Sequence, residues 1–537
     1  MRADGIAQAA TCEKIGPLLG LRLFLGSVYD PIRVSTRIYR RFGHLVEFDN
    51  LALRNHAPRR NLFVIGPDHN REVLLKNDVI RPSGLWSVNG PPGSAQQSIQ
   101  RNYFPKTFGA EHDVVAQGTN PHFKRTRVEG HFERTKAIVQ DEIAKWPRDH
   151  AVDLYELVRR LGQHVSFKLL FGETDVDRIH RFGDLLFGYH RQNWSVLPYL
   201  FPVNVKGTPY RRVLQTAETL KSYIRDWVAE SHARPPDDNL VATFAHLKDG
   251  EGNPLTAERI LAYIVFFGFA SFETLSSGTT WALLLLMLHP DIMADLLDEL
   301  SAAPALHDID YAGLSSLKLL DAVVKEVLRL IPPTPAVLFR AYARCEIAGR
   351  ALFPSSRIVM FPHMTHRLPE IYDAPMRFHP KRWFDINPSP YEYLPFSAGP
   401  RRCPGSSFGT DFLKVALIAI LSRYRIELDR RARLDWTFNG ITIPKSGALV
   451  RFVDQDGVVK AQPATGSIFD FFERSVTACR PAVAATFRRV GIDMQVYQHD
   501  RPRENGTRFS DRHGAPVADK RNTRQQELRE LQPRAKA

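Results

Sequence analysis

Residues 393–409 read YLPFSAGPRRCPGSSFG, a turn-rich stretch that places Cys403 between glycines and directly behind a pair of arginines. A cysteine binds metals or attacks substrates as its thiolate, which nearby positive charge and backbone N–H groups stabilise. Glycine and proline allow the backbone to approach such a sulfur closely. Taken alone, the loop indicates an activated cysteine, either ligand or nucleophile, and the alternative is a loop cysteine beside surface arginines.

The spacing of residues within this loop distinguishes between these roles of Cys403. The segment FSAGPRRCPG matches the pattern F-x-x-G-x-R-x-C-x-G at every fixed position, with Phe396, Gly399, Arg401, Cys403 and Gly405. This pattern resembles the haem-binding loop of the cytochrome P450 monooxygenases, in which the cysteine thiolate ligates the haem iron. The resemblance implies that Cys403 is the metal ligand and that the other four residues bind the cofactor, haem b.

Two further segments agree with the resemblance. KEVLRL supplies Glu326 and Arg329, which lie three residues apart and therefore share one face of a helix. FHPKRW resembles the F-x-P-E-R-F segment of the family and retains Arg382, with Lys381 and Trp383 in place of glutamate and phenylalanine. In the family these residues form a buried charge triad, so the resemblance implies a structural role for Glu326, Arg329 and Arg382.

The segment ASFETL places an acid and an alcohol in the middle of an apolar helix. A buried carboxylate is costly unless it is paired or functional, and a salt bridge or a capped kink is the structural alternative. The family has A-G-x-[DE]-T-[ST] here, an acid–alcohol pair over the iron that delivers protons. Glu273 and Thr274 are therefore the predicted catalytic residues, whereas Ser271 replaces the usual glycine and narrows the groove beside them.

The two haem propionates need cations. Arg401 is the first candidate by its loop position, and Arg340 follows the E-x-x-R helix as in the family. HFKRTR resembles the W-x-x-x-R helix of the family, with Phe123 in the tryptophan place, Arg127 as the arginine and His122 as a second donor. A surface basic cluster is the alternative for this last segment.

The bulk composition is that of a globular enzyme. Hydrophobic residues make up 44% of 537 residues, and the net charge of +14 comes partly from an arginine-rich C-terminus. We find no nucleic-acid-binding motif, and the four cysteines form neither a CxxC pair nor a regular pattern. Glu273 interrupts the most apolar stretch, residues 261–288, which we interpret as a buried helix, with a membrane span as the alternative. We therefore expect a cytoplasmic protein without a transmembrane anchor.

The order of elements predicts a mainly α fold with a small β region. Residues 61–77 indicate a strand, a turn and a helix; Thr256 begins a helix that runs to His289; and Gly90–Ser98 is a loop by composition. The resemblance places the haem between this long helix and the cysteine loop. We assign residues 1–454 to the haem-thiolate domain and residues 455–537 to an extension, with one possible helix at 466–490 before a disordered basic tail.

These expectations combine into a haem-thiolate monooxygenase that inserts one oxygen atom from O₂ into a hydrophobic substrate. Electrons would come from NAD(P)H indirectly, through a ferredoxin and its reductase or a flavodoxin, because the chain has no flavin or iron–sulfur motif. We expect a monomer. The alternatives are a peroxide-dependent or isomerising relative and a non-catalytic haem-binding protein. The residues expected to line the substrate site are Phe266, Phe267, Ala270, Leu275, Gly90–Ser98, Ala336–Leu338 and Phe438–Ile441.

Overall fold

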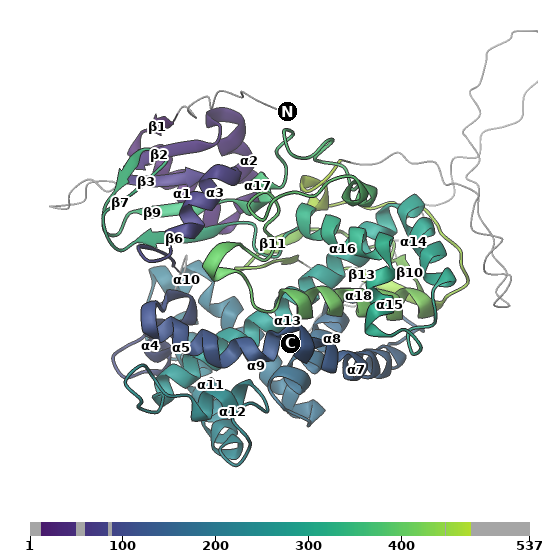
Figure 1. Ribbon diagram of the computed structural model, residues 1–537, viewed down its shortest axis with the longest axis horizontal. Coiled ribbons are helices and arrows are strands. Elements are labelled where there is room, and N and C mark those ends of the chain that lie inside the picture. Colours follow the sequence, from purple (N-terminus) through teal and green to yellow (C-terminus); the bar gives the residue numbers. More distant parts are fainter. Residues whose placement is uncertain (1–11, 50–59, 84–87, 446, 474–537) are drawn as a thin grey trace, which may run out of the picture. The chain divides into compact units, whose positions relative to one another are not determined.

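The structure, a computed structural model, describes residues 12–49, 60–83, 88–445 and 447–473. The chain divides into two compact units, residues 1–496 and 497–537, and every described residue belongs to the first. Figure 1 shows the first unit as a large set of helices together with a sheet region formed by β1, β2, β3, β9 and β6. The predicted fold class, mainly α with a small β region, is confirmed.

Helices dominate the described residues. The α-helices are α1 (Pro17–Tyr29), α2 (Pro31–Phe42), α3 (Pro67–Leu75), α4 (Ala95–Arg101), α5 (Gly109–Thr119), α6 (Arg125–Gly130), α7 (Phe132–Ala144), α8 (Leu154–Leu170), α9 (Val176–Asn193), α10 (Val196–Leu200), α11 (Pro209–Ser231), α12 (Leu240–His246), α13 (Ala257–Leu288), α14 (Pro290–Ala302), α15 (Tyr311–Ser316), α16 (Lys318–Leu330), α17 (Pro362–Thr365) and α18 (Ser406–Arg423). The 3₁₀ helices are η1 (Phe104–Lys106), η2 (Asn120–Phe123), η3 (Pro380–Phe384), η4 (Gly399–Arg401) and η5 (Ser467–Asp470).

The strands form one larger sheet and three small ones. They are β1 (Glu13–Ile15), β2 (Leu45–Asp49), β3 (Arg60–Val64), β4 (Ile80–Pro82), β5 (Val152–Asp153), β6 (Val337–Ala341), β7 (Cys345–Ile347), β8 (Arg350–Leu352), β9 (Arg357–Met360), β10 (Tyr424–Leu428), β11 (Trp436–Phe438), β12 (Thr442–Pro444) and β13 (Leu449–Asp454). The larger sheet has the order β1-β2-β3-β9-β6-β4, and the small sheets are β10-β13-β5, β11-β12 and β7-β8.

The long helix α13 lies at the centre of the largest apolar core. It begins where predicted, because the side chain of Thr256 accepts a hydrogen bond from the backbone N–H of Arg259 at 3.4 Å. It ends at Leu288, before the proline that starts α14. Helices α8, α18, α16 and α4 pack against it, so α13 is apolar nearly all round. Among the described residues it alone is long and apolar enough to cross a membrane, and most of its apolar window is buried.

The sequence-based assignment of one segment is confirmed, and that of a second is wrong at its end. The strand, turn and helix predicted at residues 61–77 appear as β3 and α3. The loop prediction for Gly90–Ser98 is wrong for its last four residues, because α4 begins at Ala95. The side chain of Ser94 accepts a hydrogen bond from the backbone N–H of Gln97 at 3.2 Å and caps this helix.

Residues 455–473 pack against the preceding chain. The carbonyl oxygen of Phe471 accepts a hydrogen bond from Arg367 at 2.8 Å, and the ring of Phe471 is fully buried beside Trp281. These residues also help line a pocket of about 410 Å³ beside the end of α13, which none of the predicted site residues lines. Of the helix predicted at 466–490, the described part contains η5, and the remainder lies outside the described residues.

Candidate active site

The cysteine loop folds back on itself through backbone hydrogen bonds. The N–H of Cys403 donates to the carbonyl oxygen of Phe396 at 2.8 Å, and the N–H of Arg402 donates to that of Gly399 at 3.1 Å. Gly399 has φ +68°, and a Cβ there would lie 3.4 Å from the carbonyl oxygen of Leu74. The left-handed backbone conformation therefore favours glycine at this turn, although a Cβ would fit the space.

Cys403 is an exposed residue of the loop, but its sulfur lies close to other protein atoms. Desolvation by these atoms raises the pKa of the thiol, while the backbone N–H of Gly405 and the charge of Arg402 lower it. A Cβ at Gly405 would lie 3.8 Å from the sulfur and 3.7 Å from the ring of Phe123. The thiol is thus reachable, and the structure supplies the donor and the cation that favour a thiolate.

The face of α13 beside the loop is partly accessible. Phe266, Ala270 and Thr274 are half-buried and follow one another at intervals of four residues, so they share one side of the helix. A Cβ at Gly409, in the first turn of α18, would lie 3.5 Å from the side chain of Leu275. Leu275, the neighbour of Thr274 on α13, therefore packs against the residues that follow the cysteine loop.

Two hydroxyl groups on α13 bond back to their own helix. Thr274 Oγ1 donates to the carbonyl oxygen of Ala270 at 3.0 Å, and Ser271 Oγ donates to that of Gly268 at 2.9 Å. The carbonyl oxygen of Ser271 also accepts a hydrogen bond from Ser166 Oγ on α8 at 3.2 Å. The serine that replaces the usual glycine is therefore held against the helix, and its carbonyl is drawn towards α8.

Glu273 is fully buried, and its carboxylate meets one side chain of α8. The phenol of Tyr155 donates a hydrogen bond to Glu273 Oε1, whereas Oε2 has no hydrogen-bond partner among the described residues. Burial raises the pKa of Glu273 to about 7, against the lowering effects of the Tyr155 hydrogen bond and of Arg159. This carboxyl group therefore exchanges protons near neutral pH.

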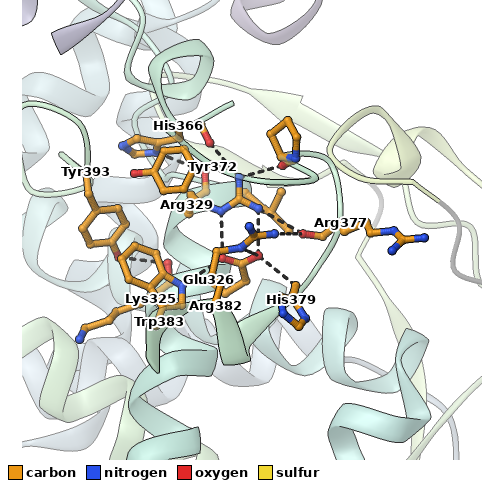
Figure 2. A network of polar contacts seen from close by, with 12 residues as sticks. Lys325, Glu326, Arg329, His366, Tyr372, Arg377, His379, Arg382, Trp383 and Tyr393 are labelled. Carbon is orange, nitrogen blue, oxygen red and sulfur yellow. Dashed lines mark hydrogen bonds and ion pairs between the residues drawn. The ribbon is translucent and has the colours of Figure 1, made fainter. Parts of the chain in front are cut away.

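The three residues of the predicted charge triad meet in the interior (Figure 2). Arg329 Nε and Nη2 donate to the two oxygens of Glu326 at 2.9 Å each, and Arg382 Nε donates to Oε1 at 3.1 Å. The N–H of His379 and the indole of Trp383 add donors at 2.9 and 3.0 Å. Glu326 therefore carries five hydrogen bonds, which compensate for burying a charge.

The other N–H groups of Arg329 and Arg382 donate hydrogen bonds to backbone carbonyl oxygens (Figure 2). Arg329 donates to the carbonyl oxygens of His366 and Pro375 at 2.8 Å and of Arg377 at 3.2 Å. Arg382 donates to Ala374 at 3.2 Å and Arg377 at 3.3 Å, and also to Asp373. The triad thus fixes the irregular segment that leads from α17 to the cysteine loop.

Four cations gather beside the loop. Arg81 on β4 lies opposite Arg340 on β6, and Arg401 Nη2 donates to the carbonyl oxygen of Thr107 at 2.8 Å, next to Lys106. Burial and Arg81 lower the pKa of Arg401, and burial and Arg340 lower that of Lys106. The Nε atoms of Arg81 and Arg401 are buried without a hydrogen-bond partner in the described chain. We call these four residues the cation cluster.

The other two cofactor candidates lie on η2 and α6, next to Phe123, which contacts Gly405 of the cysteine loop. Arg127 Nη2 donates to the carbonyl oxygens of Asp237 and Asp238 at 3.3 and 2.9 Å. His122 is buried, and its Nε2 lies 2.8 Å from the hydroxyl of Thr243. Burial and Arg127 lower the pKa of His122 to about 4. Their assignment to a propionate stays a prediction: both side chains have protein partners, but Arg127 Nε, like the Nε atoms of Arg81 and Arg401, is buried without a partner among the described residues.

The residues present fit a haem. The cation cluster contains buried guanidinium N–H groups without partners, which suit propionate carboxylates. The thiol of Cys403 is accessible and lies next to a backbone donor, as a thiolate ligand requires. Cys403 would bind the iron, and Arg401 would bind one propionate. Arg340 and Arg81 would bind the second propionate.

Sequence reasoning missed Arg81, Lys106 and Tyr155. Arg81 could be found only from its strand register opposite Arg340, and Lys106 from its place beside Thr107. Tyr155 precedes Glu273 by 118 residues, so no local pattern links the two. Of the predicted substrate-lining residues, the side chains of Phe267 and Leu275 are more deeply buried than those of Phe266 and Ala270.

Comparison with known proteins gives one consistent result. Residues 34–452 match the family model of cytochrome P450. The chain is 27% identical over 312 residues to cytochrome P450 4V2 of Mus musculus, which covers 54% of this chain and 59% of that protein. It is 26% identical over 389 residues to a putative cytochrome P450 139 of Mycobacterium tuberculosis, which covers 68% and 85%.

A solved structure shares the fold. The retinoic acid bound cyanobacterial CYP120A1 aligns with a TM-score of 0.69 and 20% sequence identity, covering 80% of this chain and 96% of that one. The chain spans a little over half of the length of the mammalian relatives that it matches.

Proposed function

Because the chain belongs to the cytochrome P450 family, we propose that it is a haem-thiolate monooxygenase. It inserts one oxygen atom from O₂ into a hydrophobic organic substrate and takes its electrons from an external redox partner. The observation that carries the proposal is the exposed Cys403, in a loop followed directly by residues that pack against Leu275, the neighbour of Thr274 on α13. When bound, the haem b supplies the oxygen chemistry of this fold, which thiolate ligation favours.

The protein's first task is to hold the thiolate. The backbone N–H of Gly405 and the charge of Arg402 favour the ionised sulfur, against the effect of burial. The ring of Phe123 lies next to Gly405, close to the sulfur. A thiolate kept in this environment remains a strong electron donor to a ligated metal.

The second task is to deliver protons. Glu273 has a pKa of about 7, so both its protonated and ionised forms are populated near neutrality. Thr274 follows it on the accessible side of α13, where its hydroxyl can leave the carbonyl of Ala270 and donate into the site. Glu273 and Thr274 therefore act as the proton donor pair of the proposed reaction.

Electrons would enter from the outer side of the cysteine loop. Arg402 is exposed, unlike Arg401, and it would face an acidic ferredoxin or flavodoxin whose reductase oxidises NAD(P)H. The chain would work as a cytoplasmic monomer. Its apolar substrate would lie against the half-buried aromatic and small side chains of α13.

The test is the absorbance spectrum of the reduced, carbon monoxide-treated, haem-loaded protein. A thiolate-ligated haem gives the red-shifted Soret band of this family, and Cys403→Ser is expected to abolish it. Cys345→Ser, at a half-buried cysteine outside the loop, is the matched control and should leave the band unchanged. A band that survives Cys403→Ser would overturn the proposal.

A turnover assay then separates the remaining functions. Product formed with O₂, NAD(P)H, ferredoxin and reductase supports a monooxygenase. Product formed with hydrogen peroxide alone, or rearrangement without any oxidant, would instead indicate the peroxide-dependent or isomerising alternative. A haem-loaded protein that binds ligands and converts none under any of these conditions would be a non-catalytic haem protein.

A further inference from the structure

Three hydrogen-bonding atoms lie buried and unpartnered where the end of α9 meets the β11–β12 hairpin. They are His190 Nε2, Trp194 Nε1 and Asn439 Oδ1, and none has a hydrogen-bond partner among the residues that the structure describes. A polar group that is buried without a hydrogen-bond partner destabilises the folded protein. Three such groups in one place therefore indicate a polar partner that the protein itself does not provide.

Ring contacts join these residues into one wall. The ring of His190 stacks on that of Phe269 of α13, with the centroids 3.5 Å apart and the planes at 13°. The backbone N–H of Trp194 donates to the carbonyl oxygen of His190 at 2.9 Å, so the two residues are one helical turn apart. The ring of Trp194 meets the edge of Phe438, 5.7 Å between centroids, and Asn439 follows Phe438 in the hairpin. We call this the aromatic wall.

The wall borders the accessible face of α13. Phe269 directly precedes the half-buried Ala270, and Thr274 lies one turn further along the helix. Gly440 allows the hairpin to approach, because a Cβ there would lie 3.2 Å from the ring of Trp194. Phe266 and Phe269 lie three residues apart and share one side of α13, so a molecule that lies along Thr274, Ala270 and Phe266 would run past the helical turn on which the aromatic wall packs.

The three atoms differ in what they recognise. The indole of Trp194 only donates a hydrogen bond, Asn439 Oδ1 only accepts, and the imidazole of His190 does either according to its tautomer. Together they match a group that accepts one hydrogen bond and can donate another. A hydroxyl group meets all of these requirements, and a carbonyl oxygen meets the donors alone.

The wall favours an uncharged ligand group. Burial lowers the pKa of His190 to about 3, and no charged group in the described chain contributes to that shift. The imidazole is therefore neutral in the folded protein at neutral pH. A carboxylate held here would be buried without a counter-charge, which is far more costly than burying a hydroxyl group that is hydrogen-bonded.

We propose that the substrate is an apolar molecule whose body lies against α13 and whose one uncharged polar group meets the aromatic wall. A hydroxyl group there would hydrogen-bond Trp194, His190 and Asn439, and a carbonyl group would accept from Trp194 and His190. This inference rests on the proposed function, because it concerns the substrate of the same site. It goes beyond that function by stating the chemical class of the substrate and the residues that select it.

The experiment compares three ligands with one carbon skeleton, namely limonene, perillyl alcohol and perillic acid. Their dissociation constants are measured by isothermal titration calorimetry on the haem-loaded full chain and on Trp194→Phe, His190→Phe and Asn439→Leu. Trp436→Phe is the matched control, because that indole lies in the same hairpin but already donates to Asp470 at 3.0 Å. Thermal unfolding of each variant shows whether it is folded.

We expect wild-type protein to bind the alcohol more tightly than the hydrocarbon and the acid. Trp194→Phe keeps an aromatic ring and removes one N–H, so affinity for the alcohol should fall about three- to tenfold. Affinity for limonene should change less than about twofold, and Asn439→Leu should give the same pattern. Trp436→Phe should leave the preference for the alcohol unchanged.

The opposite results overturn the inference. The inference fails if perillyl alcohol binds no more tightly than limonene, or if none of the three ligands binds. It also fails if perillic acid binds as tightly as the alcohol. An equal loss of alcohol affinity in Trp436→Phe would also overturn it. The carbon monoxide spectrum of the same preparations separates this failure from a failure of the proposed function. If the thiolate-type band is present but the alcohol is not preferred, only the inference about the aromatic wall is overturned.

Discussion

The phenol of Tyr155 on α8 donates a hydrogen bond to the carboxyl group of Glu273 on α13, and both side chains are buried. The two helices make the most extensive contact in the described chain, so this pair lies where the packing is densest. Burial raises the pKa of Glu273 to about 7, and Tyr155 opposes that shift by binding the ionised form. Tyr155 is therefore a positioning residue for the acid of the proposed proton donor pair.

The raised pKa of Glu273 makes stability depend on pH. The folded state holds this proton up to about pH 7, whereas the unfolded chain loses it near pH 4.5. The associated stabilisation is therefore present at low pH and is lost as pH rises through 7. Between pH 5 and 8, the free energy of unfolding of the wild type should fall by about 2–3 kcal/mol relative to Glu273→Gln.

Urea unfolding of haem-loaded protein across this pH range checks the prediction. Glu258→Gln is the control, because Glu258 is an exposed carboxylate in the first turn of the same helix. The difference between wild type and Glu258→Gln should stay flat with pH. A flat difference for Glu273→Gln as well would mean that Glu273 is ionised throughout.

Removing the phenol of Tyr155 should move the titration of Glu273 upwards. Tyr155→Phe deletes a donor that stabilises the carboxylate, and a hydrogen bond to a charged group is worth about 1.5–3 kcal/mol. The midpoint of the pH–rate profile for substrate oxidation should therefore rise by about one unit. Tyr263→Phe is the control, since Tyr263 of α13 donates instead to Glu111 at 3.1 Å. A midpoint that both variants leave in place would show that Glu273 does not control the rate.

Local sequence patterns predict the site residues that lie in short motifs. They do not predict the contacts that form when distant elements pack together. Cys403 and the Glu326–Arg329 pair lie in short motifs, so neighbouring residues in the sequence are neighbours in space. Tyr155 reaches Glu273 only because α8 packs along α13. Arg81 reaches the cation cluster through the register of an antiparallel strand pair, which no local pattern specifies.

The boundary of α4 shows the same limit on a smaller scale. Glycines and prolines before Ser94 indicate a loop, yet the Ser94 side chain caps a helix that begins at the next residue. The side chain of Glu218 on α11 accepts a hydrogen bond from the N–H of Ala95 at 2.8 Å and adds a tertiary contact at this end. The composition of these nine residues predicts a loop throughout, because it does not show that a single residue, Ser94, caps the start of a helix.

The buried triad should be sensitive to the loss of its only carboxylate. Glu326→Gln leaves Arg329 and Arg382 buried without their counter-charge, which should cost about 3–5 kcal/mol of unfolding free energy and prevent stable haem binding. Trp383→Phe removes one donor and should cost about 1 kcal/mol. Lys381→Gln, at a half-exposed ion pair with Asp295, should change stability by less than about 0.5 kcal/mol. Chemical unfolding ranks the three variants, and a Glu326→Gln protein as stable as Lys381→Gln would contradict this account of the triad.

The cation cluster should retain the haem more than Arg127 does. Arg81, Arg401 and Arg127 each have a buried Nε atom without a partner among the described residues. Arg81 and Arg401 belong to a cluster of four cations, so they offer a propionate more positive charge than Arg127, which lies outside the cluster and donates to the carbonyl oxygens of Asp237 and Asp238. A charge-assisted hydrogen bond is worth about 1.5–3 kcal/mol, so Arg81→Gln and Arg401→Gln should each speed haem loss by about tenfold or more. Arg127→Gln is the comparison and should change the rate by less than about threefold.

Haem transfer to excess apomyoglobin measures these rates, because the acceptor captures each released haem with a visible change in absorbance. Thermal unfolding of the three apoproteins controls for a general loss of structure. The double variant Arg81→Gln/Arg401→Gln should release haem faster than either single variant, since the two guanidinium groups would hold different propionate oxygens. If Arg127→Gln instead released haem faster than Arg81→Gln, the propionates would be held by the helix that the sequence motif indicated, and the cation cluster would serve another anion.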